Sequence, residues 1–179
     1  MHADLESMLF TEEEIAARVA ELAAQISRDY KEEPPLMVGI LKGAALFMAD
    51  LVKRIDLMLE MDFMAISSYG VSSKSTGVVR IVKDLDREVQ GRHVLLVEDI
   101  VDTGLTLKYL HDLMVRRQAK SVKVVSLFDK QGRREVEIEP DYRGFMVPNE
   151  FIVGYGLDYA EHYRNLPYVG VLKREIYMT

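Results

Sequence analysis

An apolar segment of this chain runs directly into two adjacent acidic residues, and a third acid follows closely. The apolar segment is Val94-Leu95-Leu96-Val97, and the acids are Glu98, Asp99 and Asp102. An unpaired charge is costly to bury, so buried strands do not normally end on neighbouring acids. Three carboxylates at the end of a buried strand therefore indicate a binding site at the edge of a sheet.

A short turn of small and hydroxyl-bearing residues follows the third acid. Its residues are Thr103, Gly104, Leu105 and Thr106. The turn leads into a helical pattern, and the free N–H groups and dipole at a helix start favour an anion such as phosphate. Gly104 allows the backbone to approach a ligand closely. The alternative is structural: Asp102 or Thr103 could simply cap the helix.

Carboxylates repel phosphate, so one ligand must meet the acids and the turn with different parts of itself. A ribose 5-phosphate does this. Its vicinal hydroxyls, or a metal bound to them, suit Glu98 and Asp99, and its phosphate suits the backbone N–H groups of residues 102–106. The spacing therefore favours a phosphorylated sugar as the ligand.

The elements around these residues alternate between apolar segments and helical patterns. A capping box at Thr11 and Glu14 predicts a helix that ends near Tyr30. Further helices are expected over residues 44–55 and 105–117. Strands are expected over residues 36–41, 57–66, 78–82, 94–97, 122–128, 151–157 and 168–172.

The order strand, turn, helix, strand is typical of an α/β fold with a doubly wound, mainly parallel sheet flanked by helices. We expect one domain over residues 1–179. Ligands of such sheets bind beyond the carboxyl ends of the strands. Lys42, Glu98, Asp99 and Lys130 each follow a predicted strand, so they should converge on one rim.

Composition excludes several classes of protein. The 179 residues include 23 basic and 29 acidic residues, a net charge of −6, which argues against non-specific nucleic-acid binding. The absence of cysteine excludes disulfides, thiolate nucleophiles and Cys-ligated metals, and it fits a reducing compartment. No apolar run is long enough to span a membrane. These features lead us to expect a cytoplasmic protein.

The segment from Glu98 to Thr106 resembles the phosphoribosyl-pyrophosphate signature of the type I phosphoribosyltransferases, in the form found in their 6-oxopurine branch. The similarity covers about residues 36–164. It includes Leu41-Lys42-Gly43, Ser68-Tyr69-Gly70, Lys130, Phe151 to Tyr159, and Arg164. The resemblance implies the type I phosphoribosyltransferase fold with a small hood. It also implies a homodimer or homotetramer, as is usual in this family.

The implied function is purine salvage. Such an enzyme moves 5-phosphoribosyl from phosphoribosyl pyrophosphate to N9 of hypoxanthine, and of guanine, giving IMP or GMP and pyrophosphate with the help of Mg²⁺. Asp102 would be the general acid/base at purine N7. Glu98 and Asp99 would hold the ribose hydroxyls and Mg²⁺, and Asp158 matches the ligand of a second Mg²⁺.

The resemblance also assigns the remaining site residues. Lys42, Gly43 and Arg164 would bind pyrophosphate, in a family where the peptide bond before this lysine is often cis. Lys130 would donate to the 6-oxo oxygen, Phe151 would stack on the base, and the Ile152 backbone would bind its edge. Leu105 occupies a position that some relatives fill with lysine, but the backbone donors of the phosphate site remain.

A Ser- and Gly-rich segment, residues 67–77, is expected to form a long loop. In the resembling family this loop acts as a lid that excludes water from the reaction centre, with Ser68 and Tyr69 placed over it. The alternative is an unstructured hairpin tip.

Two other functions stay open at this point. A nucleotide-sensing regulator could use the same fold without turnover, but it should lose the acid/base or the lid, or carry a basic face. A sister enzyme could act on xanthine, adenine or a pyrimidine. Lys130, Phe151 and Asp158 favour a 6-oxopurine.

Overall fold

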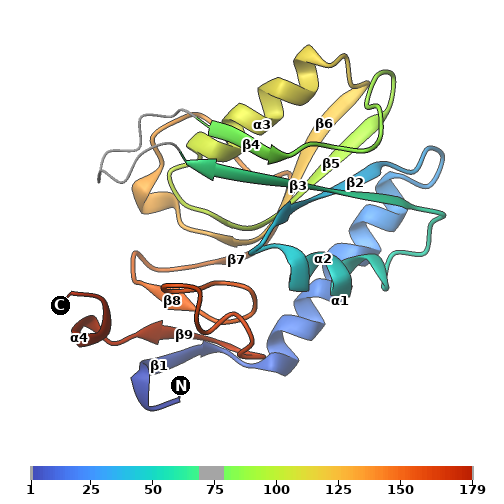
Figure 1. The fold of residues 1–179 in the computed structure, drawn as a ribbon. Coiled ribbons are helices and arrows are strands. Elements are labelled where there is room, and N and C mark those ends of the chain that lie inside the picture. The colour runs from blue at the N-terminus through green and yellow to red at the C-terminus, as the bar shows by residue number, and fades with distance from the viewer. Residues whose placement is uncertain (1, 69–78, 179) are drawn as a thin grey trace.

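The computed structural model describes residues 2–68 and 79–178. Its larger part is a six-stranded sheet in the order β4-β3-β2-β5-β6-β7 (Figure 1). Its strands are β2 (Leu36–Leu41), β3 (Glu60–Ser68), β4 (Val79–Lys83), β5 (His93–Val101), β6 (Ser121–Asp129) and β7 (Tyr142–Met146). Only β4 runs antiparallel to its neighbour, so the predicted mainly parallel sheet is confirmed.

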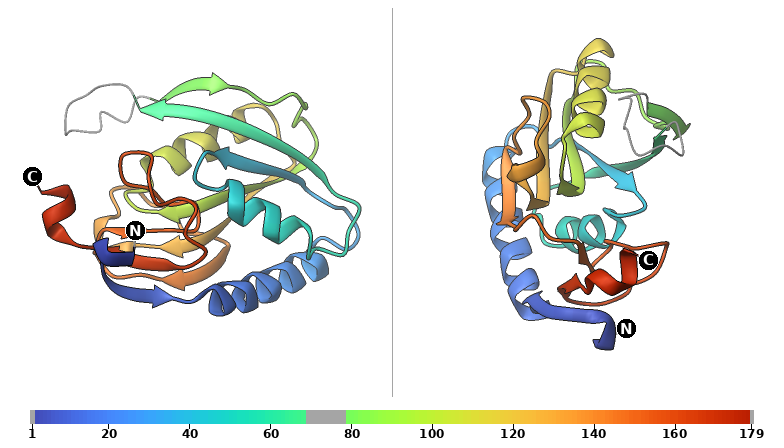
Figure 2. Two further views of the ribbon diagram at one scale, coloured as in Figure 1. Left: turned by 60° about the horizontal axis from the view of Figure 1, so that its bottom comes forward. Right: turned by 90° about the vertical axis from the view of Figure 1, so that its left-hand side faces the viewer.

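Helices cover both faces of this sheet (Figure 2). Helices α1 (Glu12–Asp29) and α2 (Ala45–Val52) pack on one face, and α3 (Leu105–Arg116) packs on the other. Along β5, Leu95 belongs to the first core and Leu96 to the second, and both are 0 % exposed. Its residues 94–97 are buried on both faces of the sheet, which is why this segment is apolar without alternation in the sequence.

Helix α1 begins as the sequence predicts. The Thr11 backbone N–H donates to Glu14 Oε2 at 2.8 Å, and the Glu14 N–H donates back to Thr11 Oγ1 at 3.1 Å. The two bonds satisfy donors that the first turn of a helix otherwise leaves unpaired. The helix is capped at its other end by Tyr30, where the prediction placed it.

A second, three-stranded sheet forms the small hood below the main sheet (Figure 1). It joins β1 (Leu5–Phe10), β9 (Val169–Leu172) and β8 (Ile152–Val153), and it is followed by α4 (Arg174–Tyr177). Short 3-10 turns lie at η1 (His2–Asp4) and η2 (Gln131–Arg133). Both ends of the chain therefore contribute to the hood.

Several element boundaries differ from the prediction. β5 does not end at Val97 but continues through Glu98 and Asp99 to Val101, because β6 beside it extends equally far. The strand expected over residues 151–157 shortens to β8, because the chain turns through positive φ at Gly154, Tyr155 and Gly156. β1 and β7 were not predicted.

The loop expected from residue 67 also begins later, since β3 includes Ser68, which pairs with Val79. Tyr69 and the rest of the predicted lid lie outside the described residues. Within residues 2–68 and 79–178, no helix combines the length and the hydropathy needed to cross a bilayer.

Candidate active site

Two pockets meet at the carboxyl end of β5. The first, here called the aromatic pocket, is lined by Asp99, Ile100, Asp102, Lys130, Arg133, Phe151, Ile152, Leu157 and Asp158. The second, here called the turn pocket, is lined by Glu98, Ile100, Val101, Asp102, Thr103, Gly104, Thr106 and Leu107. Ile100 and Asp102 line both pockets, so the two pockets adjoin at these residues.

The two adjacent acids of β5 serve different pockets: Glu98 lines the turn pocket and Asp99 the aromatic pocket. Burial raises the pKa of Glu98 well above its usual value, and the neighbouring charge of Asp99 raises it further. Burial also raises the pKa of Asp99. Two carboxyl groups that are costly to ionise side by side are suited to a cation that offsets their charge.

The donor set fits Mg²⁺, which prefers carboxylate oxygens and usually completes its coordination with water and substrate phosphates. Asp158, the third predicted metal ligand, accepts a hydrogen bond from the Glu161 backbone N–H at 2.9 Å and pairs with Arg164 at 3.2 Å. Within the described residues, no three acidic, histidine or cysteine side chains form a cage for a metal. A cation held here would need oxygen atoms from the ligand.

The turn after β5 opens α3 without a side-chain cap. Its N-cap residue is Gly104, at φ +83°, and no cap hydrogen bond from a side chain is present there. Thr103 Oγ1 lies 3.4 Å from the Leu105 N–H, a weak contact. Thr103, Gly104 and Thr106 line the turn pocket, whereas Leu105 does not. Of the capping alternative, only this weak Thr103 contact is present within the described residues, so the helix start remains available to an anion.

Asp102 stands where the two pockets join. Its Oδ1 atom is buried and has no hydrogen-bond partner within the described residues. Its Oδ2 atom lies 3.3 Å from Nη1 of Arg133. A buried carboxylate oxygen left without a donor is costly unless a ligand supplies one. Oδ1 is therefore a buried acceptor at the junction of the two pockets whose hydrogen-bonding capacity is unused within the described residues.

Lys130 lies at the side of the aromatic pocket and is 7 % exposed. Its Nζ donates to the Glu150 carbonyl at 2.8 Å, and its backbone N–H donates to the Val101 carbonyl at 2.9 Å. Burial lowers the pKa of the Lys130 ammonium. These contacts hold the Lys130 side chain at the wall of the pocket, on a segment bonded directly to β5.

Phe151 supplies the aromatic surface of the pocket. Its ring stacks on Tyr177 of α4 with centroids 4.8 Å apart, and it meets the Tyr159 ring nearly at right angles at 5.7 Å. Phe151 is still 36 % exposed. The stack fixes the ring in place and leaves part of it available to a planar ligand. Ile152, its neighbour in β8, is buried.

The predicted pyrophosphate residues, Lys42, Gly43 and Arg164, line neither pocket. The Leu41–Lys42 peptide bond is cis, the isomer often found in the resembling family. Lys42 Nζ pairs with Glu161 at 2.8 Å, and Arg164 pairs with the same Glu161 carboxylate at 3.2 Å. Arg164 also donates to the Gly156 carbonyl at 2.7 Å. The structure therefore brings the two cations together around one carboxylate.

Three residues of this region were missed by sequence reasoning: Arg133, Glu161 and Tyr177. Arg133 could have been found, since it lies in a basic pair three residues after Lys130. Tyr177 carries no local signal, because its partner Phe151 is distant in the chain. Glu161 lies three residues from Arg164, but its pairing with the distant Lys42 has no local signal.

Comparison with known proteins agrees with this geometry. The phosphoribosyl transferase domain family matches residues 6–160. The chain belongs to this family. The predicted family and fold are thereby confirmed.

Individual similar proteins show which phosphoribosyltransferases this chain resembles. The hypoxanthine-guanine phosphoribosyltransferase of Bacillus subtilis is 56 % identical over 177 residues, which cover 99 % of this chain and 98 % of that protein. The bifunctional protein TilS/HprT of Listeria monocytogenes is 58 % identical, but this chain spans only 27 % of its length. A hypoxanthine phosphoribosyltransferase structure from Staphylococcus aureus superimposes with a TM-score of 0.96 at 51 % identity, covering 99 % of this chain and 96 % of that one.

Proposed function

We propose that this phosphoribosyltransferase moves 5-phosphoribosyl from phosphoribosyl pyrophosphate to N9 of hypoxanthine and of guanine, giving IMP or GMP and pyrophosphate. One observation carries the proposal: the aromatic pocket and the turn pocket share Asp102. A ligand with its base in one pocket and its phosphate in the other has its purine imidazole ring beside that carboxylate. The names of the relatives with 51–58 % identity support the same reaction.

In the proposed reaction, the bond between N9 and the anomeric carbon forms while the bond from that carbon to the pyrophosphate oxygen breaks. The bonding electron pair leaves with pyrophosphate. The base must lose one proton, and Asp102 accepts it from N7 through its unpartnered Oδ1. Proton transfer by a positioned carboxylate contributes about 10²–10⁴-fold to rates of this kind.

The base is selected by a donor and an aromatic ring. The Lys130 ammonium would face the 6-oxo oxygen, and Phe151 would stack on the base while the Ile152 backbone binds its edge. An ammonium donates to a carbonyl oxygen but not to the amino group of adenine. The pocket thus favours hypoxanthine, guanine and xanthine as a class. Their ranking depends on groups around the 2-position.

The phosphoribosyl end is held by the acids and the turn. The N–H groups of residues 102–106 and the hydroxyls of Thr103 and Thr106 would bind the 5-phosphate. Glu98 and Asp99 would hold the ribose hydroxyls and Mg²⁺, and Asp158 a second Mg²⁺. When bound, Mg²⁺ offsets the negative charge that develops on the departing pyrophosphate. Lys42, Gly43 and Arg164 would receive that pyrophosphate.

The remaining features of the proposal rest on sequence and family resemblance. Residues 1–179 would form one domain, acting in the cytoplasm as a homodimer or homotetramer on small molecules, with neither nucleic acid nor membrane as a partner. Ser68 and Tyr69 would belong to a lid that keeps water from the reacting anomeric carbon.

The test is release of pyrophosphate from phosphoribosyl pyrophosphate and Mg²⁺, with hypoxanthine, guanine, xanthine, adenine or uracil supplied in turn. We expect turnover with hypoxanthine and guanine. Turnover with adenine or uracil alone would contradict the assigned base pocket. Binding of GMP with no turnover on any base would indicate a nucleotide-sensing regulator instead.

A further inference from the structure

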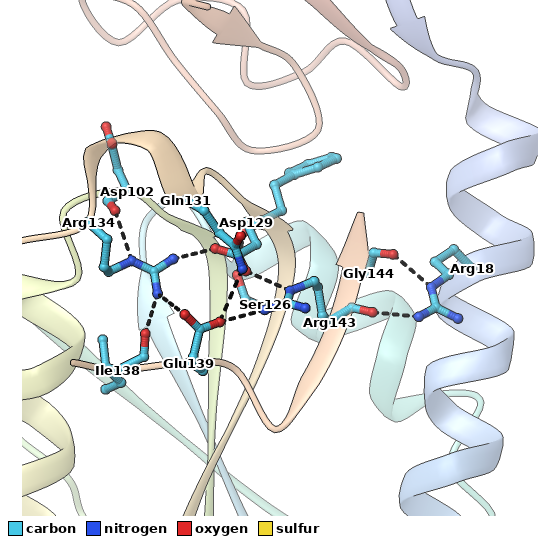
Figure 3. A network of polar contacts seen from close by, with 11 residues as sticks. Arg18, Asp102, Ser126, Asp129, Gln131, Arg134, Ile138, Glu139, Arg143 and Gly144 are labelled. Atoms are coloured by element: carbon cyan, nitrogen blue, oxygen red, sulfur yellow. Dashed lines mark hydrogen bonds and ion pairs between the residues drawn. The ribbon is translucent and has the colours of Figure 1, made fainter. Parts of the chain in front are cut away.

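A buried ion-pair network adjoins the candidate site, and the proposed reaction gives its residues no role (Figure 3). Its centre is Asp129, which ends β6 and is 0 % exposed. Two arginines share its carboxylate. Arg134 pairs with Oδ1, and Arg143 donates to Oδ2 at 2.6 Å. A buried carboxylate with one cation on each oxygen is fully paired and holds both arginines in place.

Arg134 is the arginine that reaches the site. Its Nε donates to the Asp102 carbonyl at 3.3 Å, while its other nitrogens donate to Asp129 and to the Ile138 carbonyl. The Arg134 side chain is only 12 % exposed. One rigid guanidinium thus connects the main chain of Asp102, the end of β6 and the segment that follows η2.

Two main-chain hydrogen bonds flank this contact. The Lys130 N–H donates to the Val101 carbonyl, and the Glu135 N–H donates to the Thr103 carbonyl, both at 2.9 Å. Three consecutive carbonyls of the β5–α3 turn, at residues 101, 102 and 103, therefore accept from the segment 130–135. Only the middle bond depends on a side chain, so that bond can be removed by a substitution that leaves the main chain unchanged.

Packing reinforces the same connection. A β-carbon added to Gly104 would lie 3.0 Å from Cδ of Arg134 and 2.8 Å from Cγ2 of Ile138. The turn and the 134–138 segment are thus in van der Waals contact as well as hydrogen-bonded. Movement of one requires movement of the other.

We propose that Arg134 is a positioning residue that fixes the backbone of Asp102 and the phosphate-binding turn relative to Lys130. It touches no substrate. It acts by holding the acid/base and the base-recognition amine on one rigid unit anchored at Asp129. Its effect on turnover rests on the proposed function of Asp102, whereas its effect on the turn does not.

Arg143 provides a matched control, because it binds the same carboxylate of Asp129 but contacts neither Asp102 nor Ile138 in any described bond. Its other side-chain bond, at 2.5 Å, is to Glu139. Arg134→Lys and Arg143→Lys each keep a positive charge beside Asp129 and lose a guanidinium. Only the first removes the donor to the Asp102 carbonyl.

The experiment measures kcat, KM for phosphoribosyl pyrophosphate and backbone amide hydrogen exchange of Lys130 and Glu135, whose N–H groups donate to the turn carbonyls, in both variants. For Arg134→Lys we expect kcat to fall about tenfold or more, with KM changed about threefold or less, because small displacements of a catalytic group cost large factors in rate. Exchange of these two amides should accelerate about tenfold. For Arg143→Lys, kcat and exchange of the two amides should stay within about twofold of the unaltered protein.

Equal losses of kcat and equal exchange in the two variants would overturn the proposal and reduce Arg134 to a structural role. If the unaltered protein shows no turnover, the proposed function fails, and exchange alone still decides the positioning of the turn. If Arg134→Lys does not fold, Arg134→Gln combined with Asp129→Asn removes both buried charges together, and the same two readouts apply.

Discussion

Gly43 and Asp99 lie so close together that the loop after β2 packs directly against the Asp99 carboxylate of β5. A β-carbon on Gly43 would be 1.8 Å from Asp99 Oδ2. Gly156 approaches the same loop from the hood, since a β-carbon there would lie 2.1 Å from the Gly43 carbonyl oxygen. Residues from three separate parts of the chain thus meet where pyrophosphate is proposed to bind.

Gly43→Ala is expected to raise KM for phosphoribosyl pyrophosphate about tenfold or more, because the new methyl group must displace the Asp99 carboxylate. Gly132→Ala is the control, since the nearest atom to a β-carbon there, Cβ of Asn149, is 3.9 Å away. Initial rates at varied phosphoribosyl pyrophosphate measure both. Similar KM values in the two variants would contradict the close packing at Gly43.

Asp102→Asn is expected to lower kcat about 10²–10⁴-fold, since the amide cannot accept the N7 proton. The dissociation constant of IMP should change much less, because the turn amides and Lys130 remain. Steady-state kinetics and calorimetric titration with IMP measure the two effects. Equal losses of turnover and binding would remove the acid/base assignment.

Glu98→Gln is expected to stabilise the metal-free protein while weakening phosphoribosyl pyrophosphate binding. The pKa of Glu98 is raised in the folded state, so the folded protein binds more protons than the unfolded chain, and its stability falls as pH rises above the ordinary glutamate pKa of about 4.3. A neutral amide removes this loss. Each 1 kcal/mol recovered raises Tm by about 2–4 °C.

Thermal unfolding in a chelating buffer at neutral and at mildly acidic pH measures this effect. The Tm gain should be larger at neutral pH, because Glu98 is ionised in the unfolded chain there while the folded protein disfavours that ionised form. A variant less stable than the unaltered protein at both pH values would show that Glu98 contributes packing or hydrogen bonds rather than a buried charge.

The environment of Lys130 predicts an alkaline limb in the pH profile, that is, a rise in KM for hypoxanthine at high pH. Burial lowers its pKa, so the ammonium is lost at a pH below the ordinary lysine value of about 10.4. KM for hypoxanthine should therefore rise with pH below that value. Lys130→Arg keeps its charge and should lose that limb, whereas a limb caused by titration of the base itself would remain. KM measured against pH in both proteins separates the two.

The centre of the main sheet could largely be predicted from sequence, because β2, β5 and β6 are buried on both faces. The strand predicted over residues 36–41 is β2 without change, and the capping box at Thr11 gives the start of α1. The hood strand β1 was missed because three of its six residues are exposed, which leaves no apolar pattern. β7 was missed because it is short and contains Gly144, where a β-carbon would lie 2.3 Å from the Leu127 carbonyl oxygen.

The sequence by itself determined the local chemistry: two acids on an apolar strand, a third acid, and a glycine turn that opens a helix. These follow from neighbouring residues and from the periodicity of buried side chains. Only the tertiary structure decided that Asp102 faces Arg133, that Tyr177 supports Phe151, and that Arg134 joins the turn to Asp129. Such contacts join side chains distant in sequence or projecting from an irregular loop, and no local pattern of residue types encodes which partners the folded backbone brings within reach.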